Sequence, residues 1–186
     1  RDGLAVGEGA AMLTLETLES ARRRGAEILG EIAGYATTID RHHLTQPHPE
    51  GNAAFAAMTQ ACAAADVTPA EIDYVNAHGT GTPLNDSAEA AAINQWAGAR
   101  AATLPVSSTK ASVGHLLGGA GAVETVVCLM ALRGQWLPPE LALETPDPAC
   151  KFPLVTQPQD APVNTVLSNS FGFGGINATL ILRRWA

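Results

Sequence analysis

Two successive strand–loop–helix units constrain the fold of this chain more than any other feature. Short apolar runs at 72–77 and 104–107 predict strands. A glycine-containing loop follows each run and leads to a predicted helix, at 83–96 and 119–132. Strands that alternate with helices are typical of α/β domains. We therefore expect one α/β domain over residues 1–186, with a five-stranded mixed sheet and helices on both faces.

The remaining elements are less regular. Thr82 and Pro83 suit the N-cap and first residue of the helix over 83–96, and Thr68 and Glu71 form a capping-box pattern. The proline-rich stretch 138–162 predicts an irregular surface excursion. The other expected strands cover 11–16, 27–39, 163–169 and 177–183, the last two as an antiparallel pair, and the other expected helices cover 16–24 and 52–65.

Composition excludes several classes of function. The formal net charge is −7 and no basic stripe follows a predicted helix, which argues against nucleic-acid binding. The three cysteines, Cys62, Cys128 and Cys150, show neither metal-ligand spacing nor a paired framework, so we expect reduced thiols in a cytoplasmic protein. No signal peptide is recognisable, and we expect no membrane span.

The start of the chain suggests a fragment. It begins at Arg1 without methionine and enters a strand-like pattern within about ten residues. We therefore expect that an N-terminal part of the protein is missing.

Two histidines and a lysine stand where predicted strands end. His78 follows the first strand within Asn-Ala-His-Gly-Thr-Gly-Thr, and Lys110 and His115 follow the second. A neutral imidazole can donate a hydrogen bond to a developing oxyanion, and a nearby ammonium keeps it neutral. His115 also precedes a predicted helix, whose positive end lowers an imidazole pKa. This pattern favours an assembled site.

Simpler interpretations remain open for the same residues. His78 could be a satisfied structural histidine, and Lys110 an ordinary surface lysine. Thr80 and Thr82 offer hydroxyls to a ligand, although Thr82 could serve only as an N-cap.

Glu124 is unusual because its helix is apolar nearly all round, which predicts that its carboxylate is buried. A buried carboxylate costs several kcal/mol unless it is paired or hydrogen-bonded. A lysine, a histidine or a bound cation would stabilise it.

The segment Phe171-Gly-Phe-Gly-Gly joins two predicted strands. A phosphate loop would lead into a helix, so this segment suits a glycine hairpin or a mobile gate formed by a phenylalanine. The histidines at 42, 43 and 48 lack the spacing of a zinc site.

With these residues in view, the chain resembles the C-terminal half of a β-ketoacyl-(acyl-carrier-protein) synthase, a condensing enzyme with the thiolase-like fold. Five motifs in matching order carry this resemblance: Arg-Asp-Gly-x-x-x-Gly-Glu-Gly-Ala at 1–10, Asn-Ala-His-Gly-Thr-Gly-Thr at 76–82, Ser-Ser-Thr-Lys at 107–110, Gly-His-Leu-Leu-Gly at 114–118 and Ser-Asn-Ser-Phe-Gly-Phe-Gly-Gly-x-Asn at 168–177. The resemblance implies extension of an acyl chain by decarboxylative Claisen condensation with malonyl-carrier protein.

The resemblance also implies roles for single residues. His78 and His115 would bind the thioester carbonyl, supported by Lys110. The buried glutamate of the family falls on Glu124. The pantetheine arm would contact Thr80, Thr82 and Phe171. Phe173 would act as a gate and lend its backbone N–H to an oxyanion hole. Asp40 and His43 match a loop that flanks the acyl entrance. In some members a monovalent cation lies near positions that match Asn76, Glu124, Ser168 and Asn169.

The implied partners are an acyl carrier protein with its phosphopantetheine, the missing N-terminal half, and a second ketosynthase subunit in a homodimer or heterodimer. No tightly bound cofactor is implied. No residue matches the family's nucleophilic cysteine, so we expect this polypeptide alone to be inactive and to associate through its exposed apolar helix.

Three alternatives stay open: a non-catalytic partner subunit that sets chain length, an acyl-binding scaffold, and a thiolase relative that uses coenzyme A thioesters. Fatty-acid and polyketide or polyene synthesis are not distinguished by the sequence.

Overall fold

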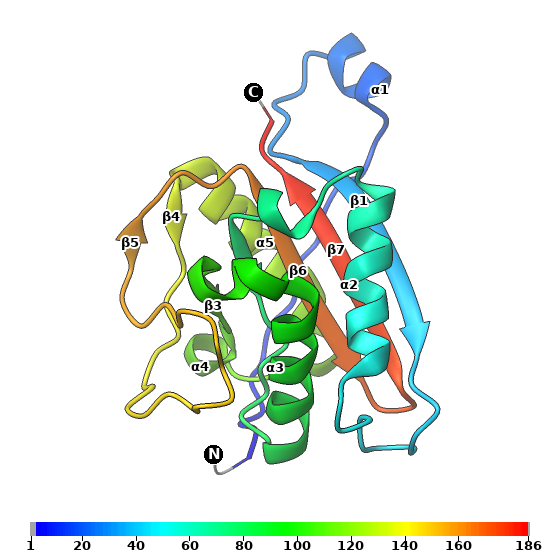
Figure 1. Cartoon of the computed structure of the whole chain (residues 1–186). Coiled ribbons are helices and arrows are strands. Elements are labelled where there is room, and N and C mark those ends of the chain that lie inside the picture. Colours follow the sequence, from blue (N-terminus) through cyan, green and yellow to red (C-terminus); the bar gives the residue numbers. More distant parts are fainter. Residues whose placement is uncertain (1–2, 186) are drawn as a thin grey trace.

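The computed structural model describes residues 3–185, which form an α/β domain around one five-stranded sheet (Figure 1). The strand order is β1-β7-β6-β2-β3. Strands β1, β7 and β6 pair antiparallel, whereas β6, β2 and β3 pair parallel, so the sheet is mixed as expected. The strands span Glu31–Ile39 (β1), Tyr74–Asn76 (β2), Val106–Ser107 (β3), Thr165–Gly172 (β6) and Ile176–Arg183 (β7).

Helices cover both faces of this sheet, which confirms the predicted architecture. Figure 1 shows α2 (Asn52–Ala64) and α3 (Pro83–Ala97) on one face and α5 (Ala120–Gly134) on the other. Successive strand residues point to opposite faces: Leu167 belongs to the core under α2 and α3, and Val166 to the core under α5. The predicted helices and strands are therefore present apart from the strand expected over 11–16, with ends that differ by a few residues.

Gly34 on β1 allows α2 to lie close to the sheet. A Cβ atom there would be 2.3 Å from the carbonyl oxygen of Ala61, far inside van der Waals contact. The backbones of α2 and β1 therefore approach each other closely at this glycine.

Smaller elements complete the chain. They are α1 (Leu18–Arg23), α4 (Lys110–Val113), 3-10 turns at Pro69–Glu71, Gly98–Thr103 and Leu117–Gly119, and a two-stranded sheet of β4 (Trp136–Leu137) and β5 (Gln159–Asp160). The capping box is confirmed, because the Glu71 carboxylate accepts a hydrogen bond from the Thr68 N–H at 2.9 Å. The proline-rich excursion is irregular apart from β5.

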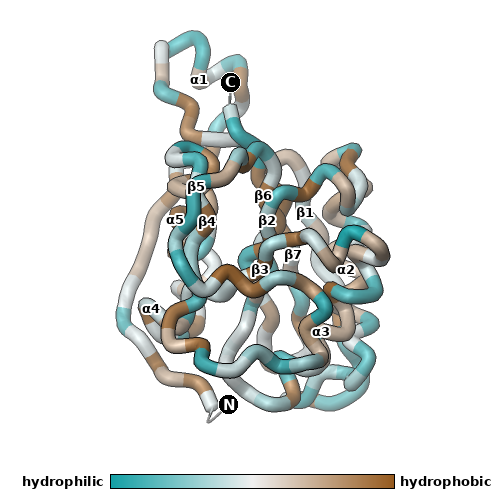
Figure 2. Tube along the Cα trace, turned by 60° about the vertical axis from the view of Figure 1, so that its left-hand side comes forward, coloured by the Kyte–Doolittle hydropathy of each residue, from teal (hydrophilic) through white to brown (hydrophobic). Residues whose placement is uncertain are grey.

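The strand predicted over 11–16 is wrong for this structure. These residues have no regular secondary structure, and the Met12 side chain is 98% exposed. Figure 2 shows the segment running along the outside of the molecule towards α1. A strand needs a neighbour for its N–H and C=O groups, and no described strand pairs with this segment.

One stretch, Leu117–Gly134, is long and apolar enough to cross a membrane by length and composition alone. This is weak evidence, because the core helix of a soluble protein passes the same test. Glu124 lies in the middle of this stretch and is paired with a lysine, which suits a core helix.

Candidate active site

The sheet topology brings the predicted site residues to one edge. Strands β2, β3 and β6 are parallel neighbours, so their carboxyl ends lie at the same edge of the sheet. His78 follows the end of β2 and Lys110 follows the end of β3. Open α/β sheets place ligands at this edge.

The structure brings His78 and His115 together. Their ring centroids lie 5.4 Å apart, with the ring planes at 84°. Phe171 lies against His78, with the two ring centroids 5.5 Å apart. His78 is buried and His115 is partly exposed. The two imidazoles therefore face one small region, although they come from loops after different strands.

His115 is held by the N-terminal segment as well as by its own loop. Its N–H donates to the Ala5 carbonyl at 2.7 Å, and its carbonyl accepts from the Gly7 N–H at 3.1 Å. The Leu117 N–H donates to His115 Nδ1 at 3.2 Å. Because Nδ1 accepts this bond, the neutral ring carries its proton on Nε2. His115 is therefore a donor on the side of the ring that faces away from Leu117.

Glu89 on α3 fixes the position of His78 and was not singled out from the sequence. Its carboxylate accepts hydrogen bonds from the N–H groups of His78 and Gly79, both at 2.8 Å. Burial raises the pKa of Glu89, and these N–H groups oppose that shift. A signal was present, because Glu89 is flanked by alanines, at 88 and at 90–92, just as Glu124 lies in a mostly apolar helix.

Both imidazoles are held in the neutral form. Burial lowers the pKa of His78 to about 2, and the nearby charges of Lys110 and His115 add to this effect. Burial also lowers the pKa of His115, again with help from Lys110. At neutral pH each ring can therefore donate a hydrogen bond without carrying a charge.

Lys110 is buried, so it is not an ordinary surface lysine. Its ammonium forms an ion pair with the Glu124 carboxylate and donates to the carbonyl of His78. The side chains of this pair are 5% and 2% exposed. Of the partners considered for Glu124, the structure provides the lysine. Burial raises the pKa of Glu124 and the adjacent ammonium opposes that shift.

Unpartnered atoms beside this pair suit the implied cation. Glu124 Oε2 and both polar atoms of the Asn76 side chain form no hydrogen bond within residues 3–185, apart from weak contacts of Glu124 with the Ser170 hydroxyl and of Asn76 with the Cys128 thiol. Ser168 pairs with Asn76 across β2 and β6. Carboxylate, amide and hydroxyl oxygens are ligands that hard cations prefer, so Asn76, Glu124 and Ser168 fit such an ion.

The Asn169 side chain does not face this group. It lies on the opposite face of the sheet, because neighbouring residues on a strand alternate. There its amide donates to Glu89 at 3.2 Å and accepts from the Thr179 hydroxyl at 2.8 Å. Its side chain supports Glu89 and hence the His78 loop.

A cavity of about 780 Å³ opens in front of the two histidines. Thr80, Thr82, Phe171 and Phe173 all line it. The hydroxyls of Thr80 and Thr82 lie 2.8 Å apart. Thr82 occupies the N-cap position of α3 but makes no capping bond with its side chain, so its hydroxyl is available to the cavity.

Phe173 stands on the tip of the β6–β7 hairpin and is 77% exposed. The hairpin is held against residues 40–44, because the Gly174 N–H donates to Leu44 and the Asp40 N–H donates to Gly175, both at 2.7 Å. Gly175 has φ +78°, and a Cβ there would lie 2.0 Å from the Asp40 carbonyl oxygen. Glycine is therefore required at this contact.

The buried thiols are unreactive. Burial raises the pKa of Cys62 to about 11 and of Cys128 to about 12. A thiol with so high a pKa is a poor nucleophile at neutral pH. Neither cysteine provides an activated nucleophile.

This mixed sheet, with two neutral imidazoles and a buried lysine at the ends of its parallel strands, has the architecture of a ketosynthase half. Residues 29–144 match the model of the "Beta-ketoacyl synthase, C-terminal domain" family. The chain belongs to this family.

Individual relatives agree with this assignment. The chain is 47% identical over its whole length to a 3-oxoacyl-[acyl-carrier-protein] synthase 2 from Synechocystis sp., covering 45% of that protein. The structure of the ishigamide ketosynthase/chain length factor aligns with 100% of this chain, which covers 45% of the chain in that structure, with a TM-score of 0.95 and 37% identity. The structure of a type II PKS acyl-carrier protein in complex with its ketosynthase aligns with 92% of this chain and with 42% of the chain in that structure, with a TM-score of 0.89 and 34% identity. The chain thus spans less than half the length of these relatives.

Proposed function

We propose that this chain supplies the malonyl-binding and decarboxylating residues of a condensing enzyme in fatty-acid or polyketide synthesis. One observation carries the proposal: two neutral imidazoles lie 5.4 Å apart at a cavity. Two neutral donors that face one point can stabilise charge on a single oxygen. The relatives named synthase and ketosynthase support this reading.

In the proposed reaction, His78 and His115 donate hydrogen bonds to the thioester carbonyl of a malonyl group. The bond between its carboxylate carbon and its α-carbon breaks, CO₂ leaves, and the electron pair passes into an enolate whose oxygen the imidazoles stabilise. The α-carbon then attacks an acyl thioester on a cysteine outside this chain. A carbon–carbon bond forms and the cysteine thiolate leaves.

The other site residues have supporting roles in this proposal. Lys110 keeps the imidazoles neutral and holds the His78 carbonyl. A cation held by Asn76, Glu124 and Ser168 would share the Glu124 carboxylate with Lys110. Thr80, Thr82 and Phe171 contact the pantetheine arm that carries the substrate, and Phe173 gates the cavity and lends its N–H to an oxyanion hole. No other cofactor is needed.

We also propose a cytoplasmic enzyme that binds an acyl carrier protein and pairs with a second ketosynthase subunit. One relative is a carrier protein in complex with its ketosynthase, and others combine a ketosynthase with a chain length factor. A non-catalytic chain-length subunit remains the alternative. The presence of both imidazoles and the lysine favours the catalytic subunit.

The direct experiment uses the full-length protein with malonyl-carrier protein and an acyl-carrier protein. We expect CO₂ release and a 3-oxoacyl product two carbons longer, detected by mass spectrometry. Release of CO₂ without the longer product, or neither, would contradict the proposed condensation.

The neutral imidazoles predict an unusual pH profile for decarboxylation by the full-length protein. Activity needs the neutral rings, and a lowered pKa means that protonation begins only below the ordinary value of 6.5. We therefore expect a constant rate as the pH falls from about 8 to about 6.5. Removing Lys110 should raise the pKa values of His78 and His115, so the loss of activity at acidic pH should begin at a higher pH. A wild-type limb centred at or above pH 6.5 would contradict this prediction.

We expect residues 1–186 alone to self-associate and to form no condensation product. Several large apolar side chains are exposed, among them Met12 (98%), Leu15 (71%) and Met130 (55%). Exposed apolar surface of this kind promotes association. Sedimentation velocity should detect dimers or larger species, and a single monomeric species would be the contrary result.

A further inference from the structure

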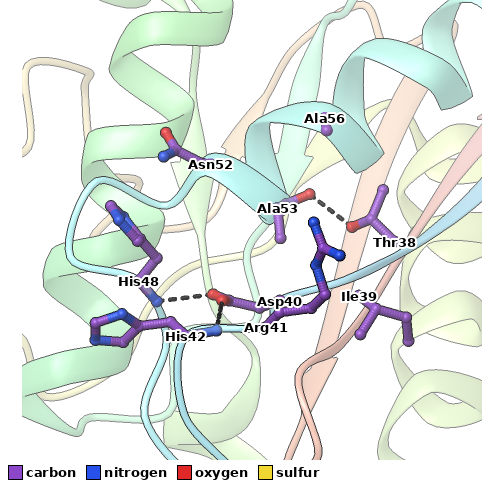
Figure 3. A pocket seen from close by; sticks show the side chains of 9 residues that line it. All are labelled: Thr38, Ile39, Asp40, Arg41, His42, His48, Asn52, Ala53 and Ala56. Atoms are coloured by element: carbon purple, nitrogen blue, oxygen red, sulfur yellow. Dashed lines mark hydrogen bonds between the residues drawn. The ribbon is translucent and has the colours of Figure 1, made fainter.

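The loop over residues 40–51, between β1 and α2, has two differently lined faces. On one face His43, Leu44 and Thr45 line the cavity in front of the histidines. On the other face Arg41, His42 and His48 line a second hollow of about 460 Å³ (Figure 3). Asp40 lines both. The second hollow therefore adjoins the proposed active site across one loop.

Asp40 fixes the shape of this loop with its side chain. Its carboxylate accepts the N–H of His42 at 2.9 Å and the N–H of His48 at 2.7 Å, as the dashed lines in Figure 3 mark. The rings of His42 and His48 lie 5.1 Å apart, edge to face. Both carboxylate oxygens are thus engaged by main-chain donors, and Asp40 forms no ion pair with Arg41.

Arg41 is exposed and has no counter-ion among the residues that the structure describes. It is the only Lys or Arg that lines either cavity among residues 3–185. Several other arginines are paired, for example Arg133 with Glu27 and Arg183 with Glu31, whereas no ion pair of Arg41 exists within the described chain. The nearest other carboxylate along the loop, Glu50, lies 3.5 Å from the Asn52 amide. In an acidic chain, an unpaired arginine at a cavity rim points to an anionic ligand.

We propose that Arg41, assisted by the His42 and His48 rings, binds the phosphodiester of the phosphopantetheine arm at the rim of the active site. The proposal rests on the proposed function. The arm carries its thioester at one end and its phosphodiester at the other, where it joins the carrier protein. When the thioester lies between His78 and His115, the phosphodiester lies towards the mouth of the cavity. The planar guanidinium fork matches phosphate oxygens, and imidazole N–H groups can add further hydrogen bonds.

The test compares three substrates of the full-length protein: malonyl-pantetheine, malonyl-phosphopantetheine and malonyl-carrier protein. Only the last two carry a phosphate. For Arg41→Gln we expect KM for decarboxylation to rise about tenfold with both phosphate-bearing substrates, the size of one lost charge-assisted hydrogen bond. KM with malonyl-pantetheine and kcat with all three should stay unchanged.

Arg184→Gln is the matched control, because Arg184 is also exposed and unpaired within the described residues but follows β7 at the end far from the hairpin. It should leave all three KM values unchanged. A rise with the carrier protein alone would assign Arg41 to a contact with the carrier's own surface and overturn the proposal. An equal rise with all three substrates, or no rise, would also overturn it. If wild-type protein decarboxylates none of them, the proposed function fails instead.

Discussion

Replacing His78 by alanine in the full-length protein should lower the rate of malonyl-carrier protein decarboxylation by about 10²- to 10³-fold, the usual cost of one oxyanion donor. The His78 ring is buried and neutral, and it faces His115 at 5.4 Å. Its loss removes one of two donors to the proposed enolate oxygen. Single-turnover release of labelled CO₂ measures the effect without interference from the later carbon–carbon bond formation.

Arg184→Gln is the control, because Arg184 lines neither cavity and follows β7 at the end far from the hairpin. It should keep the chemical rate constant at saturating substrate. His115→Ala should resemble His78→Ala, since both rings act on the same oxygen. If His78→Ala decarboxylated at the wild-type rate, the assignment of this site would be wrong.

Replacing Lys110 by methionine should reduce the free energy of unfolding by about 3–5 kcal/mol, the cost of leaving one member of a buried ion pair without its partner. The Glu124 carboxylate would remain buried in the core helix α5 without the ammonium that pairs with it. Urea unfolding followed by circular dichroism should show a lower midpoint. Decarboxylation should fall as well, because the ammonium that lowers both histidine pKa values is gone.

The double variant Lys110→Met, Glu124→Leu separates stability from function. It replaces the buried pair by apolar side chains, a change that is often neutral or stabilising. We expect the unfolding midpoint to return most of the way to the wild-type value while decarboxylation stays low. A single Lys110→Met variant as stable as wild type would show that the ion pair is not buried in the assembled protein.

Much of the fold was predictable because its signals are local. The apolar run before His78, the Thr82-Pro83 helix start and the glycine-rich connection after Phe171 each specify a conformation over a few residues. The prediction of a strand over 11–16 is wrong, because alternation indicates a strand only where a neighbouring strand can pair with its backbone groups. No described segment does so here.

The candidate site was predictable in part. Composition around Glu124 indicated burial, but not which partner would reach it, since Lys110 arrives from another element through tertiary packing. Glu89 was missed although its alanine-rich helix carried the same kind of signal. The unpaired charge of Arg41 could not be predicted from the sequence, because it depends on the Asp40 carboxylate accepting hydrogen bonds from main-chain N–H groups.

The account depends most on both imidazoles donating to one oxygen. A crystal structure of the full-length protein with a malonyl-thioester analogue that cannot lose CO₂ tests this directly. The predicted result is a thioester carbonyl oxygen within about 3.2 Å of a ring nitrogen of His78 and of His115 Nε2. An analogue whose carbonyl contacts only one ring, or neither, would contradict it.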